Sequence, residues 1–114
     1  MQVQVNTDSS IVGDDALAGR VETAARDALG RFEERITRLE IHLTDVNGAK
    51  PGPNDKRCVI EVRPAGRRPE TVTDDAGTID AAVSGALQKL RRVLDGTLGR
   101  LDDHKGAPSI RTGI

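Results

Sequence analysis

Basic side chains recur along one face of residues 79–103, and their types and spacing suit them to bind phosphate. At roughly 100° per residue, Lys89, Arg92 and Arg100 fall within about 80° of one another on a helical wheel, with Gly85 and Gly96 beside them. Arg and Lys on such a smooth face hold a protein on a nucleic-acid backbone without reading the bases. We therefore predict that these three residues contact phosphates of a nucleic-acid backbone.

A second group of basic residues lies in the first predicted helix. Arg20 and Arg31 are about three turns apart and project from nearly the same side, with Arg35 close by. Asp27 and Glu34 share this flank, so the helix has a mixed surface. We expect Arg20, Arg31 and Arg35 to be at most secondary phosphate contacts.

A third basic stretch covers residues 56–68, with a single acid, Glu61; its basic members are Lys56, Arg57, Arg63, Arg67 and Arg68. Two interpretations stay open for this stretch. It is either a solvated charged surface, in which ion pairs contribute little, or a site of phosphate contact.

Side chains for catalysis or metal binding do not form a recognisable set. The two histidines, His42 and His104, are predicted on an outward strand position and at a helix end, and Cys58 is the single cysteine. Phosphate-binding glycine loops and nucleophile-elbow glycines are absent from the sequence. We expect a binding protein, with no enzyme activity, cofactor, metal or small-molecule substrate.

The composition limits how such a protein could bind. With 114 residues the chain fits one domain, and 17 basic against 18 acidic residues give a net charge of -1, which argues against indiscriminate attraction to nucleic acid. An aromatic fraction of 1% leaves Phe32 alone and excludes base stacking as the main contact. Without a secretory signal or a long apolar run, we expect a cytoplasmic chain and no membrane partner.

Hydrophobic periodicity predicts the elements that position these side chains. Two-residue alternation predicts strands around Val3 and Val5, from Thr37, around Ile60, and over 70–74 around Val72, with a loop over 47–55. Three- and four-residue spacing predicts helices over 14–35 and from the N-cap Thr78 to about Asp103.

The predicted fold is α+β, a two-layer β-α-β-β-β-α sandwich. Each strand has one apolar face, so both helices should pack on the same face of a four-stranded sheet and leave the other face wet. This arrangement is similar to that of double-stranded-RNA-binding domains. Residues 1–105 are expected to form the domain and residues 106–114 a flexible C-terminal tail.

Particular segments make the chain resemble a known family. They are the opening strand Met1–Val5, Ala16-Leu17 and Arg35-Ile36 around the first helix, and most specifically AAVSGALQKLRR at 81–92. The chain resembles the ribosome hibernation-promoting factor and ribosome-associated translation inhibitor family, also called sigma-54 modulation proteins, in its short form without a C-terminal dimerisation domain.

The resemblance implies a partner and an activity. It implies two helices that face rRNA in the small-subunit channel where mRNA and tRNA bind, so that the bound protein blocks translation under stress. Lys89 and Arg92 match basic positions of the family's second helix, and Arg100 matches a later one. We expect a monomer or weak homodimer.

One departure from the family pattern supports an alternative. The family often has a further basic run where this chain has Asp95–Gly99, so those phosphate contacts are missing. The alternative is a protein-interaction domain that kept the fold and lost most RNA affinity. RNA binding predicts one continuous positive face across both helices, whereas protein interaction predicts patchy charge and an apolar patch elsewhere.

Overall fold

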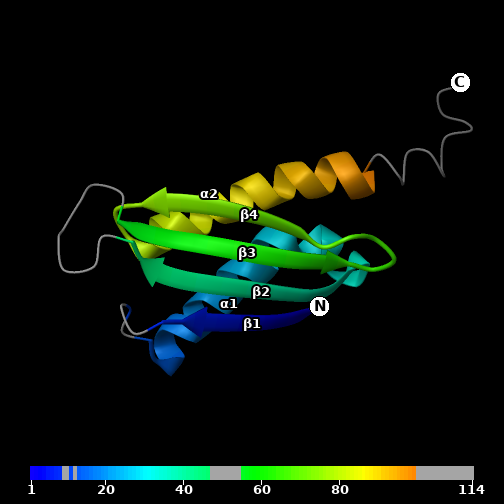
Figure 1. Cartoon of the computed structure of the whole chain (residues 1–114). Helices are drawn as coiled ribbons and strands as arrows, with labels where there is room; N and C mark the ends of the chain where they lie inside the picture. The colour runs from blue at the N-terminus through cyan, green and yellow to red at the C-terminus, as the bar shows by residue number, and fades with distance from the viewer. Residues whose placement is uncertain (9–10, 12, 47–54, 100–114) are drawn as a thin grey trace, which may run out of the picture.

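A four-stranded mixed sheet carries two α-helices on one face in the computed structural model, which describes residues 1–8, 11, 13–46 and 55–99 (Figure 1). In chain order the elements are β1 (Gln2–Thr7), α1 (Asp15–Leu29), the 3-10 helix η1 (Gly30–Arg35), β2 (Ile36–Asp45), β3 (Lys56–Pro64), β4 (Glu70–Ala76), α2 (Ile79–Leu94) and the π-helical segment η2 (Asp95–Gly99). This order confirms the predicted α+β fold.

The strands lie in the sheet in the same order as in the chain. β1 runs parallel to β2, with Val5 opposite Ile41, and the pairs β2–β3 and β3–β4 are antiparallel. The parallel pair requires a crossover, which α1 supplies. As a result β1 and β4 are the two edges of the sheet.

The core lies between the sheet and the two helices. Alternate residues of the central strands are buried on the inner face: Leu39, Ile41, Leu43, Cys58, Ile60 and Val62. The helices bury one apolar stripe each against them: Leu17, Val21, Ala25 and Leu29 from α1, and Ala82, Val83, Ala86, Leu87, Leu90 and Leu94 from α2. The opposite strand faces are polar, as predicted.

Both helices begin at side-chain caps. The Asp14 carboxylate accepts a hydrogen bond from the Leu17 N–H at 2.8 Å, and the Thr78 hydroxyl accepts one from the Ala81 N–H at 3.1 Å. Each cap satisfies a backbone donor that a helix start leaves unpaired. The prediction of Thr78 as N-cap is confirmed.

The last six residues of the predicted helix over 14–35 are not α-helical. The α-helix ends at Leu29, whose backbone (φ -111, ψ 14) leaves the helical region, and a 3-10 helix continues to Arg35. Gly30 weakens helix continuation because it has no side chain to restrict its backbone. The tighter turns bury Phe32 in the core while β2 begins at Ile36.

The second predicted helix also changes its geometry before its expected end. α-Helical bonding ends at Leu94, and η2 continues to Gly99 with wider turns that place Leu98 in the core. Residues 100–103, the loop at 47–54 and the tail at 106–114 lie outside the described residues. β4 extends two residues beyond the predicted 70–74, to Ala76.

Candidate nucleic-acid interface

The predicted contact residues lie on α1, η1 and α2, whereas Arg100 lies outside the described residues. Arg20, Arg31, Lys89 and Arg92 are exposed, and Arg35 is half-buried. The structure therefore places the predicted set on the helical layer, but it gives each member different neighbours. Those neighbours decide how much uncompensated positive charge is available to a ligand.

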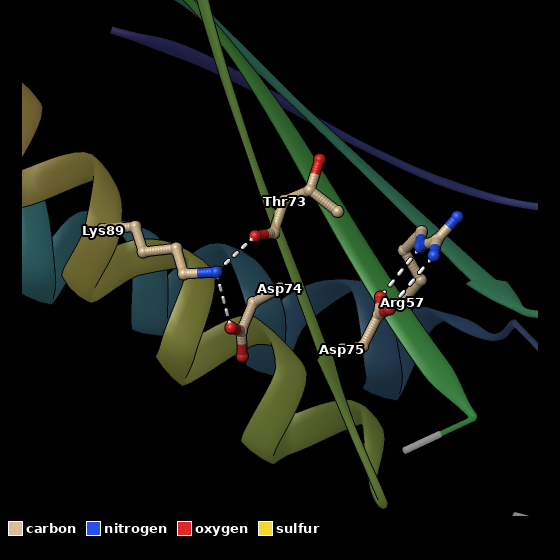
Figure 2. Close-up of polar contacts among 5 residues, drawn as sticks. All are labelled: Arg57, Thr73, Asp74, Asp75 and Lys89. Atoms are coloured by element: carbon tan, nitrogen blue, oxygen red, sulfur yellow. Dashed lines mark hydrogen bonds and ion pairs between the residues drawn. The ribbon is translucent and has the colours of Figure 1, made fainter.

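Lys89 reaches across to the edge strand β4 instead of pointing into solvent. Its Nζ donates to the Thr73 carbonyl oxygen at 2.7 Å and pairs with Asp74 Oδ1 at 2.9 Å (Figure 2). Gly85, one turn earlier on α2, makes room for this carboxylate, because a Cβ built there would lie 2.0 Å from Asp74 Oδ2. The Lys89 charge is thus compensated by an acid from another element.

Arg20 and Arg31 also have carboxylate partners from the second helical region. Arg20 Nε lies 3.1 Å from Asp80 Oδ1, and Arg31 pairs with Asp95. The side chains of all four residues are about half exposed or more. Exposed pairs of this kind contribute only about 0–1 kcal/mol, so an RNA phosphate could replace the carboxylate at small cost.

Arg91 and Arg92, in the last turn of α2, carry exposed charge without such compensation. Neither side chain has a hydrogen bond or ion pair to another residue that the structure describes. Arg91 lines an open groove of about 500 Å³ between α1 and α2, along with Arg20, Asp27 and Asp80. The sequence reasoning included Arg92 and missed Arg91, although both belong to the segment that carried the family resemblance.

The basic stretch over 56–68 divides into two parts with different environments. Lys56 lies 3.2 Å from Asp45 and 3.1 Å from Asp55, and Arg57 makes two hydrogen bonds to Asp75 at 2.8 and 3.0 Å (Figure 2). The remaining members are exposed and have no hydrogen-bonded or ion-paired side-chain partner within the described ranges: Arg63, Arg67 and Arg68. The stretch is therefore a solvated, paired surface at its start and an uncompensated basic surface at its end.

Ion pairing shifts the pKa of the first part of this stretch. The hydrogen bond and charge of Arg57 hold the pKa of the Asp75 carboxyl below its ordinary value. The hydrogen bond to Asp55 is the main cause that raises the pKa of Lys56. These charges satisfy each other and leave little field for a ligand.

The helical layer does not form one continuous positive face, because acids from both helical regions interrupt it. Nor does it offer an apolar patch: among the described residues, the single large hydrophobic side chain that is exposed is Val46. Charge is patchy, and its uncompensated part is confined to a few arginines.

The cysteine and the described histidine do not form a reactive or metal-binding site. Cys58 is buried, and burial, then the Asp74 charge, raises the pKa of its thiol to about 12. His42 is exposed, with Nε2 3.6 Å from a Glu40 carboxylate oxygen. Over the ranges that the structure describes, three or more potential metal ligands do not come together, and the helices are too short or too polar to cross a membrane.

Comparison with known proteins decides the family. Residues 5–102 match the family model described as sigma 54 modulation protein / S30EA ribosomal protein. The chain belongs to this family. Membership of the S30EA family confirms the resemblance drawn from the opening strand and from residues 81–92. No curated protein matches the chain at a significant level.

Two solved structures show the same fold as this S30EA family member. A ribosomal subunit interface protein from Coxiella burnetii has a TM-score of 0.65 at 16% identity, covering 87% of this chain and 99% of that chain. The N-terminal domain of Protein Y from Thermus thermophilus has a TM-score of 0.68 at 18% identity, covering 85% of this chain and 99% of that chain. At these identities the comparison supports the fold, and the residues must be argued from their own geometry.

Proposed function

We propose that this chain binds the small ribosomal subunit in the cytoplasm, docks on its rRNA in the channel used by mRNA and tRNA, and silences translation. Family membership and the name of the Coxiella burnetii structure, a ribosomal subunit interface protein, support the choice of partner. The observation that carries the proposal is the exposed, uncompensated charge of Arg91 and Arg92 at the end of α2.

Binding would depend on phosphate contact and shape. Phe32, the single aromatic residue, is buried at 5% exposure, so it offers no face on which a base could stack. Arginine suits such a surface because its planar guanidinium can donate two parallel hydrogen bonds to one phosphate. We therefore assign Arg91 and Arg92 as primary phosphate contacts.

The other predicted residues take secondary roles in this proposal. Arg20, Arg31 and Lys89 would exchange a carboxylate partner for a phosphate when RNA approaches. Arg35 and Arg100 remain proposed contacts on the strength of the sequence. The protein would act as a monomer or weak homodimer, by occupying the channel and without a catalytic step, membrane or small-molecule substrate.

A second candidate function is a protein-interaction domain that has lost most RNA affinity. The ion pairs Arg20–Asp80 and Arg31–Asp95 favour it, because they neutralise basic positions of the helical layer in a chain whose net charge is already -1. This function predicts that small subunits do not bind the chain even at low salt.

Translation of a defined mRNA by purified ribosomes tests the proposal. The unchanged chain should inhibit, and Arg91→Gln with Arg92→Gln should inhibit less. The matched control is Arg26→Gln with Arg57→Gln, which has the same change of net charge at two ion-paired arginines. Equal loss of inhibition in both double variants would contradict the assignment of Arg91 and Arg92.

A further inference from the structure

Uncompensated positive charge also gathers at the turn between β3 and β4, outside α1 and α2. We propose that this turn, residues 65–69, is a second RNA contact, in which Arg67 and Arg68 bind phosphates of the small-subunit rRNA backbone. The inference rests on the proposed function and extends it to a surface outside the helical layer.

The first argument is how the turn is held in place. Gly66 has a positive φ of 73°, a conformation that side chains disfavour, and this lets the chain reverse sharply. The Ala65 N–H donates to the Arg35 carbonyl at 2.9 Å, and the Arg67 N–H donates to the Pro64 carbonyl at 3.3 Å. Because these bonds fix the turn to η1 and β3, the two arginines would lose little backbone freedom on binding.

The second argument is the surface beside the arginines. An open hollow of about 880 Å³ is lined by residues 66–70 and Thr97. Its one acid, Glu70, accepts a hydrogen bond from the Thr97 hydroxyl at 3.3 Å, and makes no ion pair with Arg67 or Arg68. The hollow is polar and open to solvent, which suits a length of phosphate backbone better than an enclosed small molecule.

The third argument is the contrast between the two ends of the sheet. Figure 1 shows that the β3–β4 turn, η1 and the end of α2 lie at one end, with the start of β3 and the end of β4 at the other. At the far end Lys56 and Arg57 are compensated by Asp45, Asp55 and Asp75. Arg67 and Arg68 therefore share an end with the uncompensated arginines of α2, so one RNA surface could engage both groups.

Phosphate is the partner that this chemistry fits. Residues 65–69 include no large aliphatic or aromatic side chain. The turn therefore has no such side chain to insert into a membrane or to bury against a protein. Two adjacent arginines that are not ion-paired with an acid suit closely spaced negative charges, as on an RNA backbone.

The test is co-sedimentation with small ribosomal subunits at 50–200 mM salt. Each phosphate contact contributes about 0.7–0.9 to the slope of log affinity against log salt. Arg67→Gln with Arg68→Gln should reduce the slope by about 1.4–1.8. Over a fourfold rise in salt, the factor by which affinity falls should therefore be roughly sevenfold to twelvefold smaller for this variant than for the unchanged chain. The control Arg26→Gln with Arg57→Gln should keep the original slope.

Each outcome decides one claim. A shallower slope in the turn variant, with the control unchanged and both variants folded by circular dichroism, supports the inference. A turn variant with the slope of the unchanged chain, while Arg91→Gln with Arg92→Gln is shallower, overturns the inference and leaves the proposed function standing. No binding of the unchanged chain at 50 mM salt overturns both.

Discussion

Replacing Asp74 with Asn is expected to increase the salt dependence of ribosome binding. Asp74 holds the Lys89 ammonium group at 2.9 Å beside the edge of β4, where that charge is compensated (Figure 2). Asn has the same shape without the negative charge. When Lys89 of the unchanged chain moves to a phosphate, the Asp74 carboxylate left behind takes up a cation and offsets the counterion that the RNA releases, whereas Asn takes up none. One more counterion released in net should steepen the slope by about 0.7–0.9, roughly a threefold greater loss of affinity from 50 to 200 mM salt.

The structure also bounds the effect of this substitution on folding. The side chain of Lys89 is 48% exposed and that of Asp74 is 23% exposed, so the pair is partly screened by solvent. We expect the free energy of unfolding to fall by about 1 kcal/mol or less. Urea unfolding followed by circular dichroism measures this change and shows that the variant is folded during the binding assay.

Asp75→Asn is the matched control for the Asp74 variant. Asp75 is the next residue along β4, and its substitution makes the same change of net charge, but its partner is Arg57 on the outer face of the sheet (Figure 2). Its slope should stay at the original value, and adding Lys89→Gln to the Asp74 variant should cancel the gain. Equal slopes for the Asp74 and Asp75 variants would refute the reasoning.

Three further predictions concern folding and pH. Cys58 is buried and its thiol pKa is raised to about 12, so iodoacetamide at pH 8 should modify the native chain only as fast as it unfolds. Thr78→Ala removes the cap of α2 and should lower the free energy of unfolding by about 1 kcal/mol, measured in urea. Folding lowers the pKa of Asp75, so its contribution to the free energy of unfolding is present above the ordinary pKa of 3.8 and is lost as pH falls through the lower folded pKa. The stability difference between the unchanged chain and Asp75→Asn should therefore shrink from pH 5 to pH 3.

Different results would contradict each of these. Rapid labelling of Cys58 in the folded chain would show that the thiol is accessible. Thr78→Ser keeps the hydroxyl and should be more stable than the Ala variant, so equal stabilities of the Ser and Ala variants would contradict the role of the cap. A stability difference between the Asp75 variant and the unchanged chain that is the same at pH 5 and pH 3 would mean that the Arg57 ion pair does not stabilise the fold.

The sequence predicts the fold well because local periodicity decides it. Alternation at Leu39, Ile41 and Leu43 and the three- and four-residue spacing of the helices are read within single segments, and the structure buries those residues. Helix ends were predicted less well. Gly30 and Gly96 leave the apolar spacing intact, so the pattern continues where the backbone changes to 3-10 and π geometry.

The sites are harder to predict, because ion pairs join residues that are far apart in the sequence. A helical wheel shows only the acids of the same helix, so it counts Lys89 as available and cannot show Asp74 of β4. The same limit applies to Arg20 and Arg31, whose partners lie about sixty residues further along the chain.

The two arginines of the β3–β4 turn had a usable local signal. Arg67 and Arg68 stand between Gly66 and Pro69, so the sequence predicts a turn that exposes both, with no acid inside it. What the sequence could not supply is the division of residues 56–68 into a compensated and an uncompensated half. That division depends on carboxylates from β2 and β4.

The central claim, that this S30EA family member binds the small ribosomal subunit through phosphate contacts, is tested most directly by sedimenting the unchanged chain with purified small subunits over a salt series. The account predicts association at low salt that falls steeply and linearly in log affinity against log salt. No association at the lowest salt, or association that does not change with salt, would contradict it.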